Sequence, residues 1–161
     1  MKKILTILAA LFFSSGANAG GTINYDYVDL LLIHIELSTG MISPKRGETA
    51  YPRILYVQDK VVHELVCGKK RTCSAWAATK SNMIFLTKNV RLNEPEGDSI
   101  LYHELVHIVQ NATFGAAQEC REWADREAQA YMLQYRYAKS KGLDMDWVFD
   151  WIELIRNRCR Y

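Results

Sequence analysis

The chain has 161 residues, of which 20 are Lys or Arg and 18 are Asp or Glu. This length suits one domain with a sizeable hydrophobic core. Lys2 and Lys3 lie in the first 19 residues, which contain no acidic residue, so residues 20–161 carry equal numbers of basic and acidic side chains. Such a balance argues against a protein that binds nucleic acid by neutralising phosphates, and we expect no nucleic-acid partner.

The first 19 residues have the features of a secretory signal peptide. Two lysines precede the apolar run Ile4–Phe13, and Ala17-Asn18-Ala19 forms an A-x-A cleavage site. The run is too short for a membrane anchor, which needs about 20 residues. We therefore expect export to the periplasm or the medium, and a single mature domain, residues 20–161, without stable membrane insertion.

Helical spacing of Val28, Leu31, Leu32 and Ile35 predicts a first helix over Tyr27–Leu37. The next expected elements are a loop at 43–47, a strand at Arg53–Val57, a helix at Asp59–Val66 capped by Asp59, and a hairpin of strands Ser74–Lys80 and Asn82–Lys88. The turn of the hairpin is expected around Lys80-Ser81-Asn82.

The second half of the chain is predicted to be helical. A loop at 89–98 leads to a helix that Asp98 or Ser99 caps and that ends near Asn111. A long helix at 117–141, ended by Gly142, and a last helix at 145–158, capped by Asp144, follow. The fold class is therefore α+β, with a small mixed or antiparallel sheet of about three strands and several helices.

Four cysteines, Cys67, Cys73, Cys120 and Cys159, lie in the part expected to be exported. An even number of cysteines in an oxidising compartment predicts two disulfides. Three pairings are possible, and we favour Cys67–Cys73 across a short polar loop and Cys120–Cys159 between two late helices. A cysteine metal site is the less favoured interpretation, because C-x5-C is not a usual zinc spacing.

The tetrapeptide HELV occurs twice, and only the second copy continues to a second histidine, as His103-Glu104-Leu105-Val106-His107. Residues four apart lie on one face of a helix, so both imidazoles can reach one Zn²⁺. Glu104 is then placed to act as a general base on a metal-bound water. In the first copy Cys67 replaces the second histidine and Gly68 ends the helix, so we interpret His63 and Glu64 as an exposed helical face.

A catalytic zinc needs a third protein ligand, and no histidine follows His107. The candidates are the carboxylates of the long helix, Glu119, Glu122, Asp125 and Glu127. Glu127 is favoured because it falls within the apolar stripe of Cys120, Trp123, Ala124, Tyr131, Tyr135 and Ala138, where a carboxylate is costly unless paired or metal-bound. Glu122, Asp125, Arg126 and Gln129 are predicted to form a solvated face.

Alternatives to Glu127 as the third ligand stay open. One alternative is a structural role for Glu127, as a buried partner of an arginine, and the other is Glu119 or Glu122 as the third ligand. An antiparallel arrangement of the long helix and the HELVH helix would return Glu127 to the two histidines.

HELVH followed by Glu127-Ala128-Gln129-Ala130 resembles the gluzincin zinc metallopeptidases, and most closely their small, minigluzincin-like members. The resemblance covers roughly Arg53–Tyr135. It implies a zincin-like fold, one Zn²⁺ per chain held by His103, His107 and Glu127, and Glu104 as base and proton shuttle. It also implies an edge strand within Ser74–Leu86 that binds an extended peptide by β-addition.

The chain departs from larger gluzincins, which often carry N-E-x-x-x-D at the third ligand, whereas Ala124 precedes Asp125-Arg126-Glu127 here. The family also supplies a Tyr or His that stabilises the oxyanion, for which Tyr131 and Tyr135 are the candidates. The resulting hypothesis is an exported zinc metallopeptidase that acts on a peptide or protein. The alternatives are an inactive zinc-binding envelope protein and a disulfide-stapled interaction domain without metal.

Overall fold

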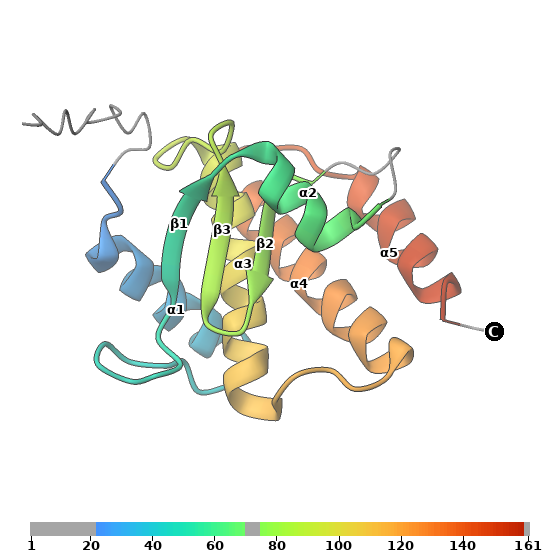
Figure 1. The fold of residues 1–161 in the computed structure, drawn as a ribbon, viewed down its shortest axis with the longest axis horizontal. Helices are drawn as coiled ribbons and strands as arrows, with labels where there is room; N and C mark the ends of the chain where they lie inside the picture. Colours follow the sequence, from blue (N-terminus) through green and yellow to red (C-terminus); the bar gives the residue numbers. More distant parts are fainter. Residues whose placement is uncertain (1–21, 70–74, 160–161) are drawn as a thin grey trace, which may run out of the picture.

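The computed structural model describes residues 22–69 and 75–159. Within these residues the chain forms five helices and a three-stranded sheet, so the predicted α+β class is confirmed (Figure 1). The predicted signal peptide, residues 1–19, lies outside the described residues.

The elements follow the predicted order with modest shifts at their ends. They are α1 (Tyr25–Thr39), β1 (Arg53–Val57), α2 (Asp59–Cys67), β2 (Ala77–Lys80), β3 (Met83–Thr87), α3 (Pro95–Phe114), α4 (Cys120–Ser140) and α5 (Trp147–Asn157).

The sheet is mixed and has the strand order β1-β3-β2. Strand β2 pairs antiparallel with β3 across the predicted turn, where Ser81 adopts a positive φ of 56°. Strand β1 pairs parallel with β3, and α2 lies in the connection between β1 and the hairpin. Both β1 and β2 are therefore edge strands of the sheet.

Helix α3 lies behind the sheet, between α1 and α4, and α5 packs on the outer side of α4 (Figure 1). The sheet turns Ile54, Ile84 and Leu86 toward this helical layer, and all three are buried. They join Leu101 and Leu105 of α3 in one core, which burial of apolar surface stabilises. The four residues that predicted α1 are also buried.

Helix α3 begins one turn earlier than predicted, because Pro95 occupies its first turn and Glu94 is its N-cap. Proline is favoured there since its missing N–H would have no partner within the helix. Asp98 and Ser99 are consequently helical residues, and the prediction that either caps the helix is wrong. The Asp98 carboxylate accepts a hydrogen bond from the Asn93 backbone N–H at 2.8 Å, which fixes the loop before the helix.

Other predicted boundaries differ in the same way. Helix α4 begins at Cys120 rather than at 117, and α5 has Asp146 rather than Asp144 as its N-cap. The Asp144 side chain instead accepts from the Asp146 N–H at 3.1 Å, within the preceding turn. Asp59 is the first residue of α2, and Gln58 is its N-cap. Asp59 and Asp144 both suit a cap, but each stands one or two positions from the N-cap residue of the observed helix.

One predicted disulfide is present, between Cys120 and Cys159, with a Cα–Cα distance of 5.5 Å. It joins the start of α4 to the residues just after α5. The other predicted pair includes Cys73, which lies outside the described residues.

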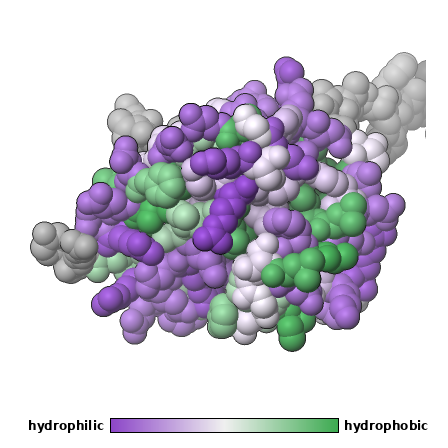
Figure 2. All heavy atoms as spheres, turned by 180° about the vertical axis from the view of Figure 1, so that it is seen from behind, coloured by the Kyte–Doolittle hydropathy of each residue, from purple (hydrophilic) through white to green (hydrophobic). Residues whose placement is uncertain are grey.

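Helix α1 is apolar on its outward side as well as on its buried side. Leu30, Ile33 and Leu37 are exposed, and hydrophobic residues gather on the side of the molecule where α1 lies (Figure 2). No helix among the described residues combines the length and the apolarity that crossing a bilayer requires.

Gly97 is a residue whose role was not apparent from the sequence. It stands in the first turn of α3, where a Cβ atom would lie 1.9 Å from the Arg91 carbonyl oxygen. The contact is with backbone rather than with a movable side chain, so the loop before α3 can pack this closely only on a glycine.

We predict that Gly97→Ala lowers the free energy of unfolding by at least about 2 kcal/mol, because the added methyl group forces the loop away from α3. Gly40→Ala is the control. Gly40 has a φ of 71° but open space at its Cβ, so it should cost only about 1 kcal/mol. Urea-induced unfolding measures both values, and equal losses would contradict the close approach at Gly97.

Candidate metal centre

Helix α4 runs back along α3, and this antiparallel pair brings together the residues that the sequence singled out. The Nε2 atoms of His103 and His107 lie 3.0 Å apart. The Glu127 carboxylate lies 3.3 Å from His107 Nε2 and 3.6 Å from His103 Nε2. These three residues are the group of side chains, among those described, whose arrangement could hold a metal ion.

The spacing of the three groups suits a tetrahedral ion. Ligand atoms at about 2.0–2.1 Å from a tetrahedral zinc lie about 3.3 Å from one another. The three separations bracket that value, and the donors are two imidazole nitrogens and the carboxylate of Glu127, whose Oε1 lies nearer His107 and whose Oε2 lies nearer His103. The backbone of α3 and α4 therefore needs no rearrangement to present three ligands to one ion.

The other carboxylates at the start of α4 do not belong to this group. Glu122 forms an ion pair with Arg126, and Asp125 lies 3.9 Å from Arg156. Glu119 is the N-cap residue of α4. The structure thus brings Glu127 to the histidines and leaves the alternative third ligands outside the group.

The predicted faces of α4 are partly wrong, although Glu127 lies where expected. Trp123 is 39% exposed, whereas the Arg126 side chain, assigned to the solvated face, is 11% exposed. Arg126 donates to the carbonyl oxygen of Gly115, in the turn between α3 and α4, and pairs with Glu122 one turn earlier on α4. The buried residues of α4 are Ala124, Ala128, Ala130, Leu133, Gln134, Tyr137 and Ala138. Glu127 stands at the border of this face, so its carboxylate is partly exposed.

Gln110 orients His107 and was missed by the sequence analysis. Its buried amide nitrogen donates to the Arg126 carbonyl oxygen at 3.0 Å and to Gln129 Oε1 at 2.8 Å. The amide oxygen therefore faces His107 Nδ1, at 2.9 Å, and accepts its proton. In the neutral His107 ring the lone pair is then on Nε2, the atom that faces Glu127. The position of Gln110, three residues after His107, was the available signal.

His103 is held in a different way. Its Nδ1 atom is buried and has no hydrogen-bond partner among the described residues. The imidazole instead packs against the Tyr131 ring, with centroids 4.4 Å apart. On the Nδ1 side, packing rather than hydrogen bonding therefore holds this ring, whose Nε2 atom faces His107 and Glu127.

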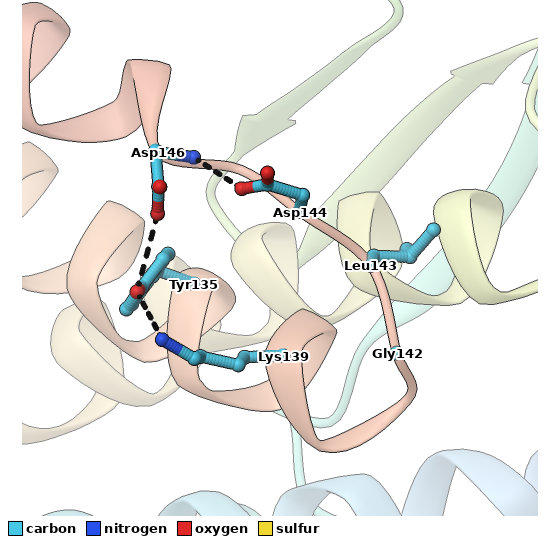
Figure 3. Close-up of a pocket in the computed structure, with 6 residues that line it drawn as sticks. All are labelled: Tyr135, Lys139, Gly142, Leu143, Asp144 and Asp146. Carbon is cyan, nitrogen blue, oxygen red and sulfur yellow. Dashed lines mark hydrogen bonds between the residues drawn. The ribbon is translucent and has the colours of Figure 1, made fainter.

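Of the two candidate tyrosines, Tyr131 lies at the histidines and Tyr135 does not share this contact. The Tyr135 hydroxyl accepts from Lys139 Nζ at 2.9 Å and donates to Asp146 at 3.4 Å. These residues line a shallow pocket of about 300 Å³ where α4 leads into α5 (Figure 3). The pocket holds none of the three residues of the candidate metal centre.

Glu104 lies on the sheet side of α3 and is 7% exposed. Its Oε2 atom accepts a hydrogen bond from the Thr79 hydroxyl at 2.6 Å, so the edge strand β2 fixes this carboxylate.

The first HELV copy is on α2, where Glu64 is exposed as expected and His63 is partly buried. Neither belongs to the candidate metal centre.

Opposite charges dominate the electrostatics of the metal-free centre. Burial lowers the pKa of His107, but the charge of Glu127 and a hydrogen bond with it outweigh burial and raise the pKa to about 9. Burial likewise raises the pKa of Glu127, yet His107 and His103 hold it well below its usual range. Without a metal, Glu127 and protonated His107 therefore form an ion pair at neutral pH.

This pair should make the stability of the metal-free protein depend on pH. The contribution of His107 is complete below pH 6.5 and is lost as the pH rises through about 9, because its folded pKa is raised. The contribution of Glu127 is complete above pH 4.5 and is lost as the pH falls further, because its folded pKa is lowered. We expect Glu127→Gln to cost about 2 kcal/mol near pH 6 and much less above pH 9.

The measurement is thermal unfolding of both proteins in chelator between pH 5 and pH 10. A difference between wild type and Glu127→Gln that stays constant over this range would show that the pair is not ionised as described.

Comparison with known proteins gives one match. A family model described as a domain of unknown function (DUF6647) matches residues 30–160, which include α3, α4 and the whole candidate centre. No curated protein and no solved structure matches the chain.

Proposed function

We propose that this chain, which belongs to the DUF6647 family, is an exported zinc-dependent metallopeptidase that hydrolyses peptide bonds. The observation that carries the proposal is the convergence of His103, His107 and Glu127, with ligand-atom separations of 3.0 to 3.6 Å. Two imidazoles and one carboxylate are the ligand set of several catalytic zinc sites, in which the fourth position is left for water.

The surroundings of the three residues also fit a metal. Gln110 leaves the Nε2 lone pair of His107 directed at the centre, as a ligand requires. His107 and Glu127 keep 16% and 19% of their side-chain surface exposed, so the centre is not sealed from solvent. A zinc ion bound there would lower the pKa of its water to about 7 and polarise a substrate carbonyl.

Glu104 is the residue that we propose moves the proton. Its Oε2 is occupied by the Thr79 hydroxyl, which leaves Oε1 to take a proton from the attacking water. The same carboxylate then delivers the proton to the amine of the leaving peptide. Because Thr79 fixes the side chain, Glu104 is oriented before substrate arrives, which reduces the entropic cost of the proton transfer.

The edge strand β2 supports the choice of an extended peptide as substrate. β2 pairs with β3 on one side, and within the described residues no strand pairs with its other side. An extended peptide added along this edge would lie beside Thr79, and therefore beside Glu104. A zincin-like arrangement and a location in the periplasm or the medium are parts of the same proposal.

The first test is the zinc content of the purified protein. We expect one zinc per chain in the wild type and in Glu104→Gln, and substoichiometric zinc in Glu127→Ala, which loses a ligand. Peptidase activity on a denatured protein substrate should fall about 10²- to 10⁴-fold in Glu104→Gln.

The three outcomes separate the candidate functions. Cleavage at the wild-type rate by zinc-loaded Glu104→Gln would refute the mechanism. If the wild type binds zinc but shows no peptide cleavage that is lost in Glu104→Gln, the result would favour a zinc-binding envelope protein. A wild type that takes up no zinc when it is offered would leave an interaction domain stapled by its disulfide.

A second test addresses Gln110. We expect Gln110→Leu to weaken zinc binding about 10- to 100-fold, because His107 loses the acceptor that fixes its tautomer. The matched control is Gln134→Leu. Gln134 is also buried between α3 and α4, but its amide donates to Ser99, at 3.4 Å. Competition with a fluorescent zinc chelator measures both affinities, and equal weakening in the two variants would assign Gln110 a structural role only.

A further inference from the structure

Tyr131 links the candidate metal centre to helix α5. One side of its ring packs on His103, with centroids 4.4 Å apart. Trp147 meets the same ring edge to face, with centroids 6.2 Å apart and an interplanar angle of 75°. Trp151, one turn further along α5, lies close enough to the Tyr131 hydroxyl to act on its pKa, which it lowers against the larger raising effect of burial. A continuous set of aromatic rings therefore leads from a histidine of the centre to the surface of α5.

Trp147 and Trp151 are not part of the buried side of α5. Val148, Ile152 and Ile155 form the buried side of this helix. Trp147 is 54% exposed and Trp151 is 37% exposed, and Leu154 continues the same exposed side. Exposed apolar surface of this kind, continuous with a site, marks a place where a ligand is held.

We propose that Tyr131, Trp147 and Trp151 form a subsite that holds a large apolar side chain, above all an aromatic one, of the peptide substrate. This inference rests on the proposed peptidase function and names the substrate class for it. The bond to be cleaved is then next to a residue such as Phe, Tyr or Leu.

Distances support a side chain close to the scissile bond. Consecutive Cα atoms of an extended peptide are 3.8 Å apart. The Tyr131 ring centroid lies 4.4 Å from that of His103 and 6.2 Å from that of Trp147, so the long side chain of a residue adjacent to the bond at the centre spans this distance. A residue several positions away would extend past Tyr131.

The geometry of the rings favours a side chain over a sugar. Tyr131 and Trp147 meet at 75° and form a corner, which offers both a face and an edge to an inserted ring. A sugar ring would instead lie flat on one exposed face. We therefore take saccharide binding as an outcome that the experiment must exclude.

The test uses zinc-loaded full-length protein and two hydroxamates that differ in one group, a benzyl or a methyl side chain beside the zinc-binding hydroxamate. Isothermal titration calorimetry measures both affinities. We expect the benzyl compound to bind wild type about 10- to 100-fold tighter than the methyl compound, because binding removes the apolar surface of the phenyl ring from water. In Trp147→Ala this preference should fall to about 3-fold or less, with binding of the methyl compound unchanged.

Two further variants serve as controls. Phe149→Ala removes an aromatic residue of α5 with similar exposure, 47%, that packs on Tyr135 instead, and it should keep the full preference. Trp147→Phe retains a ring at the same position and should keep most of it. Melting temperatures identify any variant that is impaired in folding.

Each result decides between the two proposals. Equal preference for the benzyl compound in wild type and Trp147→Ala, with zinc bound, would overturn the subsite and leave the peptidase proposal intact. Displacement of the benzyl compound by soluble peptidoglycan glycan chains, without a benzyl preference, would assign the surface to saccharides. Failure of both hydroxamates on a protein that binds no zinc would overturn the proposed function and this inference together.

Discussion

The antiparallel packing of α4 on α3 is the contact on which the candidate centre depends. A single helix can present His103 and His107 on one face, but it cannot supply a third ligand opposite them. Ala130, a small buried residue of α4 in the same core cluster as Leu101 and Leu105 of α3, allows the helices to approach closely enough for Glu127 to reach both rings. Gln110 then joins the two helices through the backbone of α4, so the helix that carries the histidines cannot shift without breaking that bond.

The three polar residues of the HELVH segment are each oriented by a different contact. Glu104 is bound by Thr79 of the edge strand, His107 by Gln110, and His103 by the ring of Tyr131. The geometry of the centre therefore depends on the sheet and on both helices of the α3–α4 pair. Glu104 and His107 are held by directional hydrogen bonds, which fix their positions. His103 packs on a ring, and this contact tolerates small displacements.

The parts of this arrangement that were predictable from the sequence are those with local causes. Helical periodicity gave α1, alternating short runs gave the hairpin, and the four-residue spacing of two histidines predicted their shared face. Glu127 was chosen because a carboxylate among apolar residues needs a partner, and the structure brings it to the histidines. Its spacing places Gln110 beside His107, but the burial of Gln110 and Arg126 was not predictable, because a buried polar residue has the same appearance in a sequence as an exposed one. Their burial depends on which residues of a distant helix face them.

The Cys120–Cys159 bridge closes a ring of the chain with a sequence separation of 39 residues. Glu127, Tyr131, Trp147 and Trp151 all lie inside this ring, whereas His103, Glu104 and His107 lie outside it. On the chain-entropy model such a closure disfavours the unfolded ensemble by about 4 kcal/mol. When the protein unfolds outside a reducing compartment, the disulfide stays intact. Glu127 of α4 and the aromatic residues of α4 and α5 then remain within one closed loop. For the three candidate metal ligands to meet again, this loop has to dock onto α3.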